Sequence, residues 1–333
     1  MSPPFSAFLL EVQPGPGGDL LRPQDRLLSL LPASYRTDTD DIVAAGRDVC
    51  ACIAKELDLK RLDRVLSWLW VAGRPMPPRP LHRQLLLSRE LFVTEQMDMH
   101  LVWTSGRLFV KPIPRFLLDP AFWMEYLCCQ SGCSCSVASE CNRPALQRRA
   151  LGFLFSYAAL ISHESDFSIA QDKHLLPPEV TWLAWRHLVE QLDTERIYSK
   201  VDVRFHYGEL RLSRLNKIYL LSQRPFLLHR YMSHWQQYWA FFQDNFAWLA
   251  SATIYITIAL TAMQVGLATR TLADNDAFQS VSYGFTVFSI LGPIAAVGLI
   301  VLVFCYMFIH NWAATVAYGK KRQQHIASSS ESP

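Results

Sequence analysis

Two long uncharged segments near the C-terminus constrain this chain more than any other feature of its sequence. Residues 246–269 read FAWLASATIYITIALTAMQVGLAT, and residues 281–309 read VSYGFTVFSILGPIAAVGLIVLVFCYMFI. A helix needs ~20 predominantly apolar residues to cross the hydrocarbon core of a bilayer. Both segments exceed that length without a single Asp, Glu, Lys or Arg. We therefore expect two membrane-spanning helices rather than two buried core helices.

The link between these segments is short, and its charge differs from that of the flanks. Residues 270–280, RTLADNDAFQS, form a link of only eleven residues, which predicts an antiparallel helical hairpin. The link holds one Arg against Asp274 and Asp276, whereas the flanks of the hairpin are basic, with Lys217, Arg224, Arg230, Lys320, Lys321 and Arg322. The positive-inside rule then places both termini in the cytosol. The sequence does not indicate which membrane holds the hairpin.

The composition fits a soluble domain joined to a few membrane segments. Half of the residues are hydrophobic and 18% are charged, which is apolar for a soluble protein and polar for a multi-spanning one. We expect a poorly ordered segment (1–34), an α-rich cytosolic domain (35–240), a transmembrane hairpin (241–312) and a basic, then Ser-rich cytosolic tail (313–333). The N-terminus lacks a basic start and is a poor signal peptide, so thiols in the cytosolic region should stay mostly reduced.

Partners and cofactors follow from the same features. A net charge of only +3 does not indicate the strongly basic surface that binds nucleic acid, so nucleic acid is not an expected partner. The expected partner is the lipid bilayer, with a homo-oligomer as a further option. The sequence points to no cofactor.

Apolar residues recur at helical spacing through much of the expected cytosolic domain. The expected helices are one capped by Thr39 and Asp40 that runs through Ile53, and others over 59–69, 81–92, 148–162, 180–192 and 209–221. Residues 150–162 carry no charge but are too short to span a bilayer, so we expect them at the centre of the cytosolic core. Residues 201–208 read as a short extended link.

One β-hairpin interrupts these helices. Residues 97–104 alternate between apolar and polar side chains, Ser105-Gly106 offers a tight turn, and residues 107–111 form the return strand. His100 lies on the first strand without a partner at ligand spacing, and we interpret it as part of a solvated strand face. The predicted fold class is mainly α: a helical cytosolic domain with one β-hairpin, followed by a C-terminal two-helix transmembrane hairpin.

A polar string directly after the expected core helix contains residue types that bind metals. His163, Glu164 and Asp166 lie within four residues of one another and could together bind a divalent ion. The alternative is a polar helix end with local hydrogen bonds, and we favour it because no second acidic cluster is visible.

Cysteines gather in the stretch CCQSGCSCSVASEC, residues 128–141. The candidate zinc ligands are Cys129, Cys133, Cys135 and Cys141, but the stretch has no Cys-x₂-Cys knuckle of the kind that structural zinc sites favour. Acylation of Cys128 or Cys129 is a second interpretation. The leading interpretation is a loop of reduced thiols. Cys50 and Cys52 would point about 200° apart on a helix, which disfavours a shared metal and favours buried or neutral thiols.

Polar residues within and between the two spans have two interpretations each. The first span contains the polar residues Thr257, Thr261 and Gln264. They would either line a pore or a substrate path, or form hydrogen bonds between helices, and we favour the hydrogen bonds. The link between the spans contains Asp274, Asn275 and Asp276. In one interpretation these residues bind hydrated cations at the outer mouth of a pore, and in the other they form a hydrophilic turn.

Several stretches resemble an uncharacterised family of fungal membrane proteins with a domain of unknown function. They are residues 79–123, RALGFLFSYAALISHESDF (149–167), VDVRFHYGELRLSRLNKIY (201–219) and most of 245–293. The resemblance implies no activity and no catalytic residues. Members sometimes carry a subtilisin-like protease label, but this sequence has no Gly-Thr-Ser-type nucleophile turn and no Asp, His and Ser in protease contexts.

The architecture is also similar to that of CorA-like magnesium channels, which have a large cytosolic region, two C-terminal spans and a basic tail. Those channels carry a Gly-Met-Asn signature where this chain has Met263-Gln264-Val265-Gly266-Leu267.

Our first hypothesis is therefore a membrane-anchored cytosolic interaction or scaffold domain. The alternative is a divergent two-span cation channel or transporter, which requires a homo-oligomer because two spans cannot enclose a pore. An enzyme that uses His163, Glu164 and Asp166 ranks third.

Overall fold

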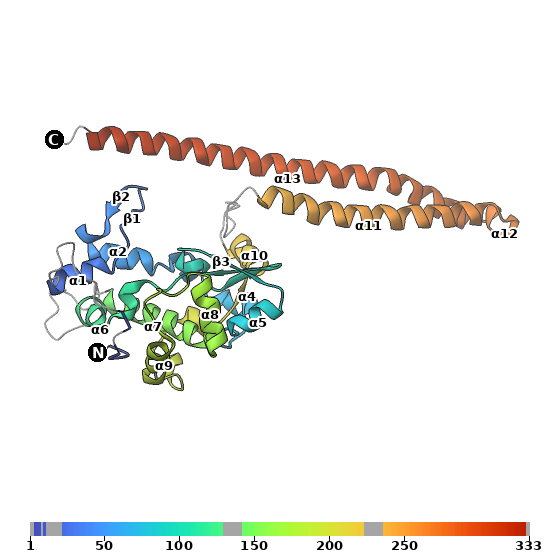
Figure 1. The fold of residues 1–333 in the computed structure, drawn as a ribbon. Helices are drawn as coiled ribbons and strands as arrows, with labels where there is room; N and C mark the ends of the chain where they lie inside the picture. Colours follow the sequence, from blue (N-terminus) through green and yellow to red (C-terminus); the bar gives the residue numbers. More distant parts are fainter. Residues whose placement is uncertain (1–2, 8, 11–21, 129–141, 223–235, 331–333) are drawn as a thin grey trace. The chain divides into compact units, whose positions relative to one another are not determined.

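The computed structural model describes residues 3–7, 9–10, 22–128, 142–222 and 236–330, as drawn in Figure 1. The chain divides into two compact units, Met1–Tyr231 and Met232–Pro333, and each is described by itself. The described residues are mostly helical, with a small sheet that contains a β-hairpin and two long apolar helices near the C-terminus. The predicted fold class is confirmed. The finer domain boundaries expected from the sequence stay a prediction.

Short helices make up most of the first unit. The α-helices are α1 (Pro23–Ser29), α2 (Val49–Glu56), α3 (Lys60–Asp63), α4 (Leu69–Ala72), α5 (Leu81–Leu86), α6 (Pro120–Phe122), α7 (Arg143–Leu160), α8 (Glu164–Asp172), α9 (Trp182–Gln191) and α10 (Leu212–Ser222). The 3₁₀ turns are η1 (Ala45–Arg47), η2 (Leu66–Trp68), η3 (Met97–Met99), η4 (Arg115–Leu118), η6 (Ile197–Ser199) and η7 (Val203–His206), and η5 (Trp123–Leu127) is a π-helical turn.

Two small sheets complete the first unit. The first pairs β1 (Ser34–Arg36) with β2 (Ile42–Ala44) in antiparallel fashion. The second has the strand order β3-β5-β4-β6, built from β3 (Glu90–Val93), β4 (Val102–Thr104), β5 (Arg107–Val110) and β6 (Leu210–Arg211). β4 and β5 form the predicted hairpin, while β3 and β6 add parallel strands on either side. The hairpin is therefore the centre of a four-stranded mixed sheet.

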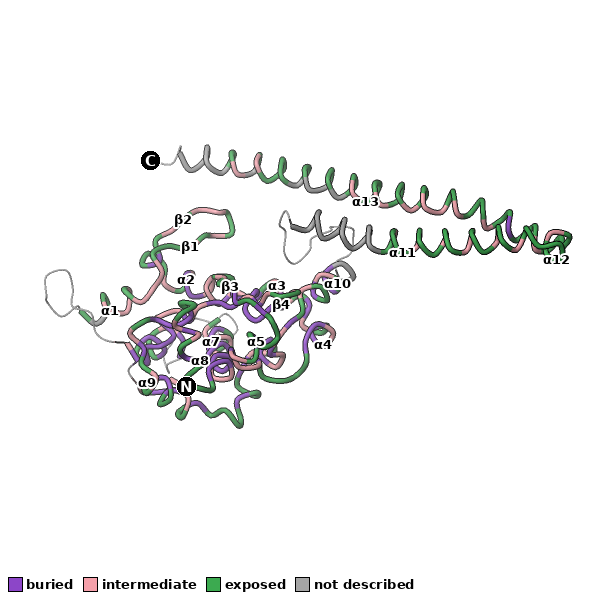
Figure 2. The backbone as a smooth tube through the Cα atoms, turned by 45° about the vertical axis from the view of Figure 1, so that its right-hand side comes forward, coloured by how far each residue is buried: buried purple, intermediate pink, exposed green. Residues whose placement is uncertain are grey.

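Helix α7 lies in the core of the first unit, as the uncharged run in its sequence predicts. Phe153, Leu154, Tyr157 and Leu160 on this helix are fully buried, and Figure 2 shows the surrounding tube largely in the colour for buried residues. A helix that is apolar on most sides can be stable only when other elements cover it. Gly152 on the same helix permits one close approach, because a Cβ atom there would overlap the ring of Phe205 from η7.

The helix expected from Thr39 begins later than predicted. Residues 42–44 form strand β2 instead, and α2 starts at Val49 after Asp48, whose carboxylate accepts a hydrogen bond from the backbone N–H of Ala51 at 2.9 Å. Asp40 has a left-handed backbone with φ of 62°, and the chain there turns from β1 into β2. Pairing of the two strands therefore prevails over the helical spacing of the apolar residues.

The helix expected over 81–92 is also shorter in the structure. Helix α5 ends at Leu86, Ser88 adopts a left-handed φ of 54°, and residues 90–93 become strand β3. β3 pairs with β5, a contact between residues that no local pattern reveals. The structure likewise divides 59–69 into α3, η2 and the start of α4, forms the 3₁₀ turn η7 within 201–208, and opens 209–221 with strand β6 before α10.

The prediction that His100 lies on a solvated strand face is wrong. His100 follows the turn η3 and is only 1% exposed. Its Nε2 lies 2.9 Å from the hydroxyl of Ser156 on α7, and its Nδ1 accepts a hydrogen bond from the backbone N–H of Lys111 at 3.2 Å. Strand β4 begins only at Val102, so the alternation expected from residue 97 does not apply to His100.

The second unit consists of α11 (Gln236–Leu267), α12 (Arg270–Ala273) and α13 (Asp276–Ser330). α11 and α13 pack against each other, and Gly266 allows a close contact, because a Cβ atom there would lie 2.8 Å from Cζ of Phe278. Trp248–Leu267 and Asp276–Tyr306 are long and apolar enough to cross a membrane, and neither is buried within the protein. Figure 2 shows both helices as mainly exposed or intermediate.

Candidate metal centre

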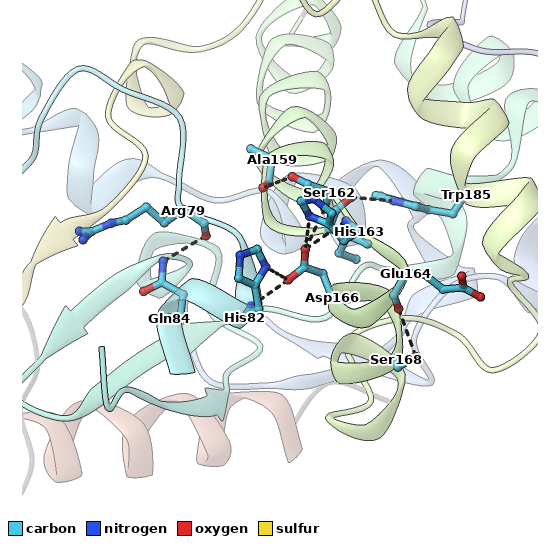
Figure 3. Close-up of polar contacts among 11 residues, drawn as sticks. Arg79, His82, Gln84, Ala159, Ser162, His163, Glu164, Asp166, Ser168 and Trp185 are labelled. Atoms are coloured by element: carbon cyan, nitrogen blue, oxygen red, sulfur yellow. Dashed lines mark hydrogen bonds and ion pairs between the residues drawn. The ribbon is translucent and has the colours of Figure 1, made fainter. Parts of the chain in front are cut away.

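Three side chains that commonly bind metal ions come together between α5 and α8 of the first unit. His82 belongs to α5, His163 stands at the N-cap of α8, and Asp166 lies in the first turn of α8. One potential ligand atom from each of the three residues lies within 4.8 Å of the other two. Figure 3 shows the carboxylate of Asp166 between the two imidazole rings.

Local sequence explains how α8 positions two of the three residues. After α7 ends at Leu160, the chain turns, and the backbone N–H groups of Ser162 and His163 donate to Oδ2 of Asp166 at 3.3 and 3.1 Å. An acidic side chain in the first helical turn that accepts from the N-cap backbone satisfies a donor that the helix itself leaves free. The local hydrogen bonds expected at this polar helix end are therefore present.

His82 lies 84 positions before Asp166 in the sequence. Helix α5 begins after Pro80 and packs against α8. The backbone N–H of His82 donates to Oδ1 of Asp166 at 2.8 Å, and Nδ1 of His82 lies 2.8 Å from the same oxygen. Nδ1 of His163 lies 3.5 Å from Oδ2. Both carboxylate oxygens of Asp166 therefore face an imidazole nitrogen.

Burial and hydrogen bonding act in opposite directions on Asp166. Burial of the side chain raises the pKa of its carboxyl, but hydrogen bonds from the backbone and side chain of His82 and from the backbone of His163 lower it further than burial raises it. The pKa of Asp166 therefore lies below its usual value of 3.8, and the carboxylate is ionised at neutral pH.

The two histidine side chains remain accessible, unlike the carboxylate between them. The side chain of His82 is 39% exposed and that of His163 is 68% exposed, whereas that of Asp166 is fully buried. Their rings meet edge to face with centroids 5.4 Å apart. Solutes can thus reach the imidazoles from the solvent side, while the protein holds the carboxylate in place.

Glu164, the third residue of the predicted metal-binding string, is not part of this cluster. Its side chain is exposed and points away from the other two in Figure 3, and its backbone carbonyl accepts a hydrogen bond from the hydroxyl of Ser168 at 3.1 Å. The structure thus keeps His163 and Asp166 together and adds His82 in place of Glu164. Sequence reasoning missed His82 because a single histidine early in a helix carries no signal of a partner 84 positions away.

The predicted cysteine ligands Cys129, Cys133, Cys135 and Cys141 lie outside the described residues. Cys128 is buried, and burial raises the pKa of its thiol. Cys50 is exposed, whereas Cys52 is fully buried. Burial, followed by the nearby charges of Glu56 and Asp48, raises the pKa of Cys52 to about 12, so this thiol is neutral.

Two of the predicted polar residues in the second unit, Thr257 and Thr261, form hydrogen bonds within their own helix. The hydroxyls of Thr257 and Thr261 donate to the carbonyl oxygens four residues earlier, at 2.8 and 2.9 Å. Asn275 accepts from the backbone N–H groups at the start of α13, at 3.1 and 3.2 Å. Gln264, Asp274 and Asp276 are exposed. The bonds of the two threonines therefore lie within one helix rather than between helices.

Comparison with known proteins places the chain in a family. A profile described as "Family of unknown function (DUF6601)" matches residues 49–293, well over half of the chain. The chain belongs to this family. The match covers the four-stranded sheet and the His82–His163–Asp166 cluster, and extends through α11 into α13 as far as Pro293. No curated protein and no solved structure matches the chain. These comparisons therefore lend no support to a subtilisin-like or a CorA-like label.

Proposed function

We propose that this member of the DUF6601 family is an integral membrane protein whose folded first unit acts as an interaction or scaffold domain at the cytosolic face. The observation that carries the proposal is the contrast between the two units. The first buries an extensive apolar core, whereas the apolar stretches of α11 and α13 are unburied. Side chains such as Ile258, Leu291 and Leu299 are about 60% exposed and would be stabilised by lipid.

Surface side chains of the first unit favour an interaction role. Trp68 and Trp70 are 51% and 63% exposed on η2 and α4, and Leu86 at the end of α5 is 81% exposed. Exposed large apolar side chains are frequent on surfaces that bind a protein or a membrane, and Trp68 and Trp70 lie two positions apart in the chain. The basic flanks of the spans support an orientation with both termini in the cytosol.

Charged substitutions within the spans test the membrane anchor. A lysine at the centre of a membrane helix costs roughly 2.5–3.5 kcal/mol on insertion. The double variant Ile258→Lys, Leu299→Lys should therefore move the full chain from the carbonate-resistant membrane fraction into the soluble or aggregated fraction. The matched control is Leu183→Lys, which replaces a 65% exposed leucine on α9 and should stay in the membrane fraction. Release of the parent chain by carbonate would refute the anchor.

The accessibility of introduced cysteines tests whether α13 crosses the membrane. A membrane-impermeant thiol reagent applied to intact vesicles should label a cysteine placed at Thr271, on α12 between the two spans, from the side opposite to one placed in the tail at Ser332. Labelling of both positions from the same side would contradict two membrane crossings.

The alternative is an oligomeric two-span cation channel or transporter. Such a channel needs polar groups that face a pore, but the hydroxyls of Thr257 and Thr261 are bound to their own helix, and Asn275 caps α13. These bonds occupy the donors of the two threonines, whereas Gln264, Asp274 and Asp276 are exposed, so oligomeric state is the deciding measurement. The mass of the detergent-solubilised protein separates the two hypotheses, because a strict monomer excludes a channel and leaves the anchor intact.

A further inference from the structure

We propose that His82, His163 and Asp166 form a binding site for one divalent transition-metal ion, with Zn²⁺ as the expected ion. The proposal does not depend on how the chain is anchored. The site would join α5 to α8 through an ion, in addition to the hydrogen bonds that already connect the two helices.

The chemistry of the donors selects the class of ion. Two imidazole nitrogens and one carboxylate oxygen are typical ligands of zinc and of neighbouring transition metals. Magnesium and calcium prefer all-oxygen sites, and the cluster supplies a single carboxylate. Glu164, which would have added a second carboxylate, is exposed and points away.

The distances within the cluster suit a shared ion. Two atoms bonded to one zinc ion at ~2.0–2.1 Å can lie at most ~4 Å apart. Oδ1 of Asp166 lies 2.8 Å from Nδ1 of His82, and the other oxygen, Oδ2, lies 3.5 Å from Nδ1 of His163, so each imidazole is within that limit of one carboxylate oxygen. The three ligand atoms lie within 4.8 Å of one another, so a shift of about an ångström by an exposed imidazole completes the set.

The surroundings hold the carboxylate while leaving the ion a path from solvent. Asp166 is fixed by hydrogen bonds from the backbone N–H groups of His82, Ser162 and His163. Such outer hydrogen bonds orient a metal ligand and strengthen binding. The two imidazoles are partly exposed, so an ion can enter directly. Three protein ligands leave a coordination position for water or for a group from a partner.

A zinc titration tests the site directly. The full chain in detergent, with Cys129, Cys133, Cys135 and Cys141 replaced by serine to remove the competing thiols, is stripped with a chelator and titrated with Zn²⁺ by calorimetry. We expect one ion per chain. His163→Ala should weaken binding by more than the ~10–100-fold that loss of an outer-shell partner costs, because it removes a direct ligand.

Two control variants separate the site from general surface binding. Glu164→Gln removes the neighbouring carboxylate, and His187→Ala removes an exposed histidine whose Nδ1 lies 3.4 Å from Glu190. Both should bind Zn²⁺ as the parent does. An absence of binding by the parent, or equal binding by His163→Ala, would overturn the proposal and leave a hydrogen-bonded helix cap without a metal.

Two further readouts keep the test decisive if His163→Ala folds poorly. Zn²⁺ should raise the Tm of the parent but not that of His82→Asn, which keeps the backbone N–H that donates to Asp166. Co²⁺ in place of Zn²⁺ should give the weak visible bands of nitrogen and oxygen ligands. Intense thiolate charge-transfer bands would place the ion on a cysteine and overturn the assignment.

Discussion

Glu209 receives two parallel hydrogen bonds from the guanidinium of Arg79, each 2.9 Å long. A second guanidinium, that of Arg89, donates to the same carboxylate at 2.6 Å, and the side-chain amide of Gln84 donates at 2.8 Å. The side chains of Glu209 and Arg89 are both 8% exposed. This buried ionic cluster connects the residue before β6 to the segment around α5.

Replacement of this carboxylate should destabilise the first unit strongly. Glu209→Gln removes the negative charge and leaves Arg89 buried without its counter-ion, which typically costs about 3–5 kcal/mol. Denaturant unfolding monitored by tryptophan fluorescence measures the change. The control is Glu190→Gln, which breaks an exposed pair with Arg186 on α9 and should cost less than ~0.5 kcal/mol. Equal effects of the two variants would contradict a buried ionic cluster.

The same carboxylate should make stability depend on acid pH. Burial raises the pKa of Glu209, but hydrogen bonds from Arg79, Arg89 and Gln84 outweigh burial and hold the pKa below its usual value of 4.5. A group whose pKa is lower in the folded state binds a proton more readily when unfolded. Its contribution to stability is therefore present above about pH 4.5 and lost as the pH falls through the folded-state pKa.

Unfolding free energies of the parent and of Glu209→Gln between pH 7 and pH 3 measure this contribution. The difference between the two proteins should shrink as the pH falls below the usual glutamate pKa, because the parent then loses its own charge at this position. A difference that stays constant over this range would show that the ionisation of Glu209 does not contribute.

His100 and Ser156 give a prediction on a neutral hydrogen bond in the core. Burial, and then the charges of Arg204 and Lys111, hold the pKa of His100 well below its usual value, so the ring is neutral. Because Nδ1 accepts from Lys111, Nε2 carries the proton and donates to Ser156. Ser156→Ala leaves this donor buried without an acceptor, at a cost of about 1–3 kcal/mol in unfolding free energy.

Ser199→Ala is the matched control for that variant. Ser199 is exposed and its hydroxyl donates to the nearby carbonyl of Arg196, so its loss should change stability by less than ~0.5 kcal/mol. A stability for Ser156→Ala that equals that of the control would mean that His100 finds another acceptor.

The two cysteines of α2 should differ sharply in reactivity. Thiolates react with alkylating reagents and thiols hardly do, so burial and a pKa of about 12 should protect Cys52 in the folded protein. Cys50, on the same helix, is exposed and should be alkylated at neutral pH. Peptide mass spectrometry after brief labelling distinguishes the two sites. Labelling of Cys52 at the rate of Cys50 would contradict its burial, whereas protection that disappears in denaturant would support it.

Features that depend on one continuous stretch of the chain can be predicted from the sequence. Two uncharged runs of membrane-spanning length identify α11 and α13, and the uncharged run in residues 150–162 predicts the buried helix α7. The turn at Ser105-Gly106 predicts the hairpin of β4 and β5. In each case one continuous stretch of the chain carries the information, because the length of an apolar run and the chemistry of a tight turn are local properties.

The tertiary structure alone decided which distant residues meet. Strands β3 and β6 are short and form only because the β4–β5 hairpin offers them hydrogen-bonding edges, so residues 90–92 form part of a strand although the sequence predicts a helix there. His100 is buried because α7 packs over it. His82 meets Asp166 because α5 packs against α8. Such contacts are stabilised by burial and hydrogen bonding between separate parts of the chain, which no single stretch of sequence encodes.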